Sequence, residues 1–207
     1  MGIIHRVKSL IRENKYRKSD MMSKRTKKMV LTALMMSMVY VATTMIKIPT
    51  PTMGYIHFGD CVVLLCGYLL GPGLGALAAG IGSMFSDVLS PYIIYAPGTL
   101  IIKALNAIVA SNVFIILMKS RKNDSKKVSS RYCTMSLLIS GILAEIIMVL
   151  GYFGYDILVA VVLNREADRM TLAVGIIYAA ASVPFYIIKA LVNIVIATIL
   201  YPILKRV

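Results

Sequence analysis

Five ionisable side chains lie within long apolar stretches of this sequence. They are Asp60, Asp87, Lys103, Glu145 and Lys189. A charged group inside a lipid-spanning helix is costly, so such groups usually face the interior of a bundle and mark a pathway or a binding site. For Lys103 and Lys189 we favour a polar pocket, in which Glu145 is the expected resting partner of Lys189. For Asp60 and Asp87 a structural or gating role is the alternative, in which Asp60 caps its helix and Asp87 pairs with a nearby lysine.

Other polar side chains recur at helical spacing around these charges. Residues three, four or seven apart share one face of a helix. The resulting stripes are Thr99, Lys103 and Asn106; Tyr186, Lys189 and Asn193; and Glu145 with Tyr152. They combine hydrogen-bonding groups with charges, and the tyrosine rings add faces for stacking. This inventory suits a polar heterocycle or an anionic group, although the two asparagines could equally hold helices together.

The composition indicates that the solvent of these helices is lipid. Of the 207 residues 58% are hydrophobic, and the mean hydropathy is +0.79, which is too apolar for a soluble domain of this size. The net charge of +14 could indicate a protein that binds nucleic acid. The location of the basic residues distinguishes that class from a membrane protein. Most of them gather before Met29, between Lys119 and Arg131, and at Lys205-Arg206, so they lie almost entirely between the apolar runs. That distribution is typical of a membrane protein.

The apolar runs predict an all-α integral membrane protein, a bundle of six transmembrane helices. A span needs about 20 apolar residues, and a backbone in lipid must satisfy its own hydrogen bonds. Gly71-Pro72-Gly73 predicts a tight turn between the second and third spans. Pro184 divides the last apolar run, so we expect residues 172–182 to form an outer loop or lid. The expected spans are residues 29–46, 58–70, 74–89, 97–118, 133–155 and 184–204.

The basic segments predict the orientation, because short loops rich in lysine and arginine stay in the cytoplasm. Four spans separate the first basic segment from the second, and two separate the second from the third. Both termini are therefore expected in the cytoplasm, with residues 47–57, 90–96 and 156–171 outside. Asp60, Asp87 and Lys103 then lie in the outer half of the bundle. We expect two regions, a basic cytoplasmic segment over residues 1–28 and a substrate-binding domain over residues 29–204.

Several features argue against other classes of protein. The basic first segment lacks the apolar centre of a signal peptide. Cys61, Cys66 and Cys133 lie in or beside apolar runs, so we expect no disulfide, metal or cofactor. The two histidines, His5 and His57, form no metal motif, which argues against an enzyme. A stand-alone secondary transporter remains the alternative, although no internal repeat supports it.

Several short motifs are spread over residues 29–204. They include the run from Ile48 to Asp60 and the segment from Val183 to Lys189. The others are Leu70-Gly71-Pro72, Ser86-Asp87 with Tyr95-Ala96-Pro97, and Ile101-Ile102-Lys103. Together they resemble the substrate-binding subunits, or S components, of energy-coupling-factor (ECF) vitamin importers. The first run resembles the first outer loop and the start of the second helix of that family, and the segment from Val183 resembles the sixth helix of its riboflavin-type members.

The resemblance implies a vitamin bound near the outer face under loops one, three and five, which adds Tyr55 of the first loop to the candidate substrate-binding residues. It also implies that a small-residue face of the first helix, here Ala33 and Ser37, meets a transmembrane coupling subunit that carries two ATPases. The family usually has alanine at both places, so Ser37 is a departure. Among relatives with this loop, hydroxymethylpyrimidine (a thiamine precursor) and vitamin B6 rank ahead of riboflavin. The expected location is the bacterial plasma membrane.

Overall fold

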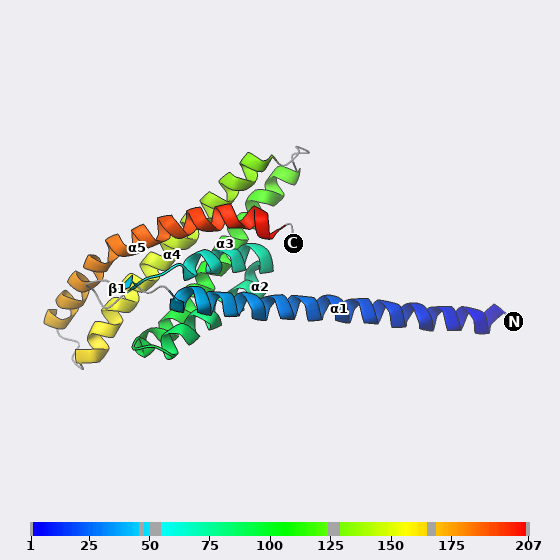
Figure 1. Cartoon of the computed structure of the whole chain (residues 1–207), viewed down its shortest axis with the longest axis horizontal. Helices are drawn as coiled ribbons and strands as arrows, with labels where there is room; N and C mark the ends of the chain where they lie inside the picture. Colours follow the sequence, from blue (N-terminus) through cyan, green and yellow to red (C-terminus); the bar gives the residue numbers. More distant parts are fainter. Residues whose placement is uncertain (1, 46–47, 50–54, 124–128, 165–168, 206–207) are drawn as a thin grey trace.

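Apolar residues fill long stretches with few interruptions, and the chain accordingly folds into long helices (Figure 1). The structure is a computed structural model, and it describes residues 2–45, 48–49, 55–123, 129–164 and 169–205. Five helices in this part are long and apolar enough to cross a membrane. The elements are α1 (Gly2–Met45), β1 (Ile48–Pro49), β2 (Tyr55–Ile56), α2 (Gly59–Val88), η1 (Ile93–Tyr95), α3 (Ala96–Asn123), α4 (Ser130–Asn164) and α5 (Arg169–Leu204).

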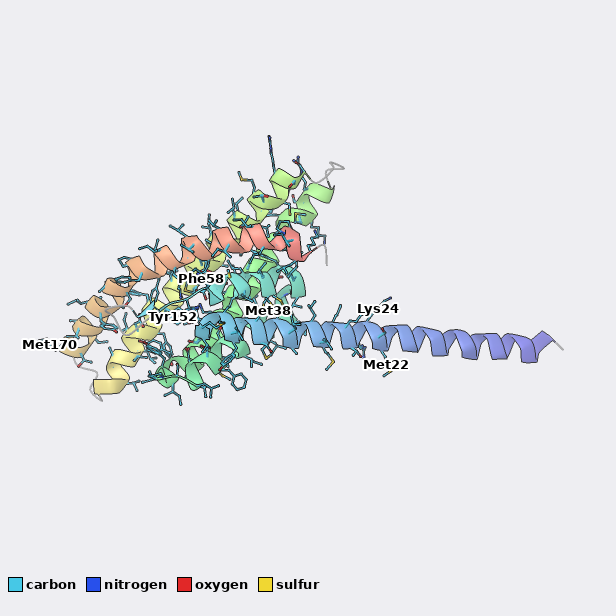
Figure 2. The ribbon with its side chains drawn as sticks, viewed as in Figure 1. Met22, Lys24, Met38, Phe58, Tyr152 and Met170 are labelled. Carbon is cyan, nitrogen blue, oxygen red and sulfur yellow. The ribbon has the colours of Figure 1, made fainter. Side chains whose placement is uncertain are left out.

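Helix α1 has one face packed on α2, while its first half projects away from the bundle (Figures 1 and 2). The buried face repeats every three or four residues, at Thr32, Met35, Val39 and Thr43. The hydroxyls of Thr32 and Thr43 donate to the carbonyls four residues earlier, so they need no water. Apolar side chains such as Met38 are exposed on the other faces, as expected for a helix surrounded by lipid.

Helix α2 consists of two helical arms that fold back on each other at Gly71. This glycine has φ 83° and ψ −179°, a left-handed conformation that residues with a Cβ rarely adopt. Pro72 follows, and proline suits the first turn of the second arm because it lacks a backbone N–H. Gly75 then lies against Cys66, where a Cβ would approach the Cys66 carbonyl oxygen to 2.6 Å. The predicted Gly71-Pro72-Gly73 turn therefore corresponds to this kink.

The prediction of an outer loop or lid over residues 172–182 is wrong, because α5 is helical from Arg169 through Pro184 to Leu204. At 36 residues it is about 54 Å long, and Figure 1 shows it bowed along the bundle. A proline removes only one backbone hydrogen bond, so it can bend a helix without ending it. The predicted outer segment 156–171 is also corrected, since α4 continues to Asn164.

A short antiparallel ribbon connects α1 to α2, and the sequence analysis did not predict it. Ile48 pairs with Ile56, and Pro49 pairs with Tyr55. The ribbon leads directly into His57 and the first turn of α2, and β2 contacts α5. It thereby positions the start of α2 between neighbouring helices.

The buried apolar residues form two clusters. The larger one joins α1, α2, α3, α4 and α5 around Val63, Leu64, Phe114 and Tyr201. The smaller one comprises Ile102, Met148, Tyr152, Tyr186 and Ala190, which come from α3, α4 and α5. Buried polar residues lie close to the smaller cluster, so it forms one wall of the polar site described below.

The close approach of the two arms of α2 makes a testable prediction. We expect Gly75→Ala to destabilise the protein by about 1–3 kcal/mol, because the new methyl group would push the arms apart. Gly73→Ala is the matched control: its Cβ would meet nothing within 4 Å, so stability should change by about 0.5 kcal/mol or less. Thermal unfolding of both variants in detergent measures the difference. Equal melting temperatures would show that the arms are not in close contact.

Candidate ligand-binding site

The site is built around a single carboxylate, that of Asp60, in the first turn of α2. Asp60 is fully buried, and its Oδ1 accepts a hydrogen bond from Lys103 Nζ of α3. Its Oδ2 lies 3.0 Å from Lys189 Nζ of α5. Both ammonium groups are also buried, at 1% and 3% exposure. Three helices are therefore joined by one ion cluster that water does not reach. The sequence analysis expected Glu145 as the resting partner of Lys189, and the structure places Asp60 there instead.

Two tyrosine rings lie against these lysines. Lys103 Nζ is 5.1 Å from the centre of the Tyr152 ring, and Lys189 Nζ is 5.5 Å from the same ring. Lys189 Nζ is also 5.6 Å from the centre of the Tyr186 ring. The two rings are 5.6 Å apart and tilted by 34°. Figure 2 shows Tyr152 within the bundle. Such rings stabilise cations and offer flat faces to a planar ligand.

Neighbouring polar groups extend the site along α3 and α4. The Tyr152 hydroxyl donates to Thr99 Oγ1 at 3.2 Å, and Asn106 Nδ2 donates to Glu145 Oε1 at 3.4 Å. The remaining side-chain oxygens, Asn106 Oδ1 and Glu145 Oε2, are buried and have no hydrogen-bond partner among the described residues. Buried polar atoms are nearly always paired in native proteins. These two oxygens are therefore available to hydrogen-bond donors of a ligand.

Asn193 has a different environment from the other predicted site residues. Its Oδ1 accepts from the backbone N–H of Cys61 at 3.0 Å, and its Nδ2 donates to the carbonyls of His57 and Lys189. The amide therefore fastens the start of α2 to α5, one residue from Asp60. This agrees with the alternative in which the asparagine holds helices together, and it positions the ion cluster.

Asp156 and Tyr95 were missed by the sequence analysis. Asp156 is buried at 2% exposure and accepts hydrogen bonds from the hydroxyls of Tyr95, at 3.1 Å, and Tyr186, at 3.0 Å. The carboxylate thus connects η1, α4 and α5 beside the tyrosine rings. Its spacing offered a signal, because Asp156 lies four residues after Tyr152 on one helical face. The sequence analysis assigned residue 156 to an outer loop and so did not apply that spacing.

Asp87 and Tyr55 are two further predicted residues. Asp87 is buried in the last turn of α2, where its carbonyl accepts hydrogen bonds from the N–H and hydroxyl of Ser90. The backbone of Tyr55 belongs to β2, but its side chain is outside the described residues, so its role stays a prediction.

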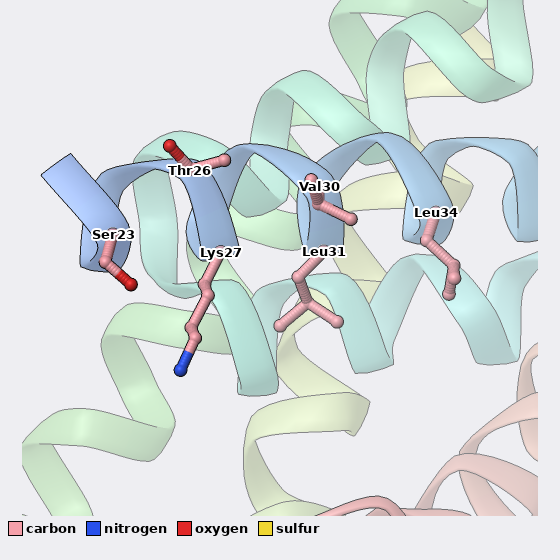
Figure 3. A pocket seen from close by; sticks show the side chains of 6 residues that line it. All are labelled: Ser23, Thr26, Lys27, Val30, Leu31 and Leu34. Atoms are coloured by element: carbon pink, nitrogen blue, oxygen red, sulfur yellow. The ribbon is translucent and has the colours of Figure 1, made fainter.

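Ala33 and Ser37 lie on the exposed side of α1, available to a partner. The Ser37 hydroxyl donates to the Ala33 carbonyl at 3.0 Å, so it bonds within its own helix. Ser37 can therefore present a nearly flat surface despite differing from alanine. Figure 3 shows a neighbouring face of α1, which bears a shallow depression with a volume of about 570 Å³. Its lining residues are Ser23, Thr26, Lys27, Val30, Leu31 and Leu34.

Comparison with known proteins decides the family. The family model described as "ECF-type riboflavin transporter, S component" matches residues 23–206. The chain belongs to this family. It is thus a multi-pass protein of the cell membrane and a transporter subunit, not an enzyme.

Two individual proteins are similar to this S component. An "Uncharacterized protein in gap 3'region" of Pyrococcus woesei is 33% identical over 115 residues, which cover 55% of this chain and 68% of that protein. A solved structure described as "Structure and mechanism of the S component of a bacterial ECF transporter" superposes with a TM-score of 0.58. The superposition covers 88% of this chain and 97% of the solved chain, at 21% sequence identity. The two chains therefore share the same fold.

The ion cluster makes a second testable prediction. Asp60→Asn would leave two buried ammonium groups without their carboxylate, which should cost about 3–5 kcal/mol of stability. Removing Lys103 as well, in Asp60→Asn/Lys103→Met, should recover part of that loss because one uncompensated charge is gone. Thermal unfolding of the two single variants and the double variant completes the cycle. Additive effects would show that Asp60 and Lys103 do not interact.

Proposed function

We propose that this S component captures a small water-soluble vitamin or vitamin precursor at the outer face of the membrane, for ATP-driven import by partner subunits. The observation that supports this most strongly is the buried Asp60–Lys103–Lys189 cluster beside the Tyr152 and Tyr186 rings. A charged cluster is costly inside a membrane protein, and function is the usual reason for its presence. Cations, unpaired acceptors and aromatic faces together suit a planar nitrogen heterocycle with hydroxyl groups.

The proposed topology has six crossings and both termini in the cytoplasm. Counting the two arms of α2 as separate spans gives six, because the chain reverses direction at Gly71. The N-terminus, the C-terminus and the adjoining ends of α3 and α4 lie toward one end of the molecule in Figure 1. These are the basic segments, which stay in the cytoplasm. Residues 1–28 then form a cytoplasmic segment, and Asp60 near the start of α2 lies in the outer half.

The proposed ligand class includes three vitamins or precursors. The sequence resemblance ranks hydroxymethylpyrimidine and vitamin B6 ahead of riboflavin, whereas the matching family is described by riboflavin. All three contain a flat nitrogen heterocycle with hydrogen-bonding substituents. The proposed binding residues are Tyr55, Thr99, Lys103, Asn106, Glu145, Tyr152, Tyr186 and Lys189, and Asn193 holds the first turn of α2 beside them. Calorimetric titration of the purified protein with each of the three compounds distinguishes the candidates. The compound with the lowest dissociation constant is then the substrate.

Lys189 provides the sharpest test of ligand contact. We expect Lys189→Met, which keeps the bulk, to weaken binding by about 1.5–3 kcal/mol, roughly ten-fold to a hundred-fold in affinity, because a hydrogen bond to a charged group is lost. Lys28→Met is the matched control, since Lys28 is exposed on α1 far from the site. Calorimetry on monodisperse protein measures both. Normal affinity with a lowered melting temperature in Lys189→Met would make this lysine purely structural.

The proposed partners are the ECF transmembrane coupling subunit and its two ATPases, with Ala33 and Ser37 at the contact. We expect Ala33→Trp or Ser37→Trp to leave vitamin affinity unchanged and to abolish uptake, because bulk prevents close helix approach. Ile116→Trp is the control: this residue of α3 is 65% exposed, and uptake should persist. Uptake assays and copurification with the coupling subunit measure the effect. Copurification at the wild-type yield in the α1 variants would place the interface elsewhere.

A further inference from the structure

A second surface depression lies where α3 ends and α4 begins. Its lining contains none of the residues of the Asp60 ion cluster. It encloses about 650 Å³ between the end of α3, the start of α4 and the end of α5. We call it the basic-end groove. Its lining includes Phe114, Met118, Lys119, Ser130, Cys133 and Lys205. The vitamin site uses none of these residues, so this groove needs a separate explanation.

The groove combines an apolar wall with a cationic and hydroxyl-bearing rim. Phe114 and Met118 of α3 and Cys133 of α4 supply the wall, while the exposed Lys119 and Lys205 supply the charge. Ser130 adds a hydroxyl at the same end. Such an arrangement fits an amphiphile that has a negative head and a hydrocarbon tail.

Lys205 lies over an aromatic platform at the end of α5. Its Nζ lies 5.5 Å from the centre of the Tyr201 ring. That ring packs edge-on against Phe114, at 5.3 Å between centres, and against Tyr68, at 5.8 Å. Tyr201 is buried at 4% exposure, so the platform beneath Lys205 belongs to the core. The cation therefore lies beside the groove.

The groove residues lie at the ends of the apolar spans, where lipid headgroups are expected. The apolar spans run over Ile93–Arg121, Ser130–Val162 and Met170–Leu204. Lys119 lies two residues before the end of the first of these, Ser130 begins the second, and Lys205 follows the third. Ile115, on the groove wall, is 47% exposed, as expected for a residue that faces acyl chains.

Among the residues that the structure describes, the lining of the groove contains no carboxylate to balance these charges. The carboxylates whose side chains the structure describes are those of Asp60, Asp87, Glu145 and Asp156, and none of these residues lines the groove. Arg121 also belongs to this end of α3, where its guanidinium stacks on the Tyr132 ring at 4.9 Å. Basic pockets between transmembrane helices at the cytoplasmic side are suited to anionic headgroups.

We propose that the basic-end groove binds one anionic phospholipid, whose phosphate lies between Lys119 and Lys205 and whose acyl chain follows Phe114 and Met118. This inference does not depend on which vitamin the protein binds. Charge complementarity and headgroup depth favour a lipid over a soluble anion, because the groove walls are apolar and continue onto the lipid-facing surface.

Titration of the full-length protein with fluorescent phosphatidylglycerol, in neutral detergent at fixed ionic strength, tests the proposal. Phosphatidylcholine with the same fluorophore and chains serves as the uncharged reference. Wild type should prefer phosphatidylglycerol, and Lys119→Gln/Lys205→Gln should lose about thirty-fold in affinity for it, since each lysine near an anionic lipid contributes about five-fold. Affinity for phosphatidylcholine should not change. Arg25→Gln/Lys28→Gln is the matched control, because it removes two exposed charges from α1 and should keep the preference.

Three outcomes would overturn the proposal. Wild type could bind both lipids equally, or the groove variant could retain its preference for phosphatidylglycerol. The α1 control could lose as much affinity as the groove variant, which would indicate general attraction to the net positive charge. Thermal unfolding of the same samples shows whether each variant is folded.

Discussion

The rest of this structure depends on the burial of one carboxylate between two ammonium groups. Asp60 of α2 contacts Lys103 of α3 and Lys189 of α5 where no water reaches them. Removing Asp60 would leave two uncompensated ammonium groups in a medium that cannot solvate them, so the three helices must keep their relative positions. The direct cluster has two positive charges and one negative charge. A ligand that accepts hydrogen bonds from a lysine would complete it, which connects the architecture with the proposed capture of a vitamin.

The packing around this cluster explains how the three helices come close enough to share it. Gly71 reverses the chain within α2, and Gly75 allows the second arm to lie on the first. The amide of Asn193 ties the backbone at Cys61 and His57 to α5, which fixes the depth of Asp60. Asp156 restrains Tyr95 and Tyr186 from the other side. Hydrogen bonds of this kind replace water inside the bundle, where unsatisfied polar groups are costly.

Spacing along single helices could be predicted from the sequence, and pairing between helices could not. The stripe of Thr99, Lys103 and Asn106 and the stripe of Tyr186 and Lys189 follow from helical geometry, and both contribute to the site. The choice of Asp60 over Glu145 as the partner of Lys189 depends on how α2 packs against α5, which no local pattern contains. Pro184 was read as a break because proline is unfavourable in helices, yet α5 continues through it. Asp156 was missed because the expected end of its helix came too early.

The central claim is that the lysines beside Asp60 belong to a ligand site and not only to the scaffold. Mass spectrometry of the small molecules that copurify with the detergent-extracted protein tests it most directly, because it requires no prior choice of vitamin. Wild type should carry one vitamin-sized nitrogen heterocycle per chain, and folded Lys103→Met/Lys189→Met protein should lack it. Retention of the same molecule at the same ratio in that variant would show that these lysines serve the scaffold alone.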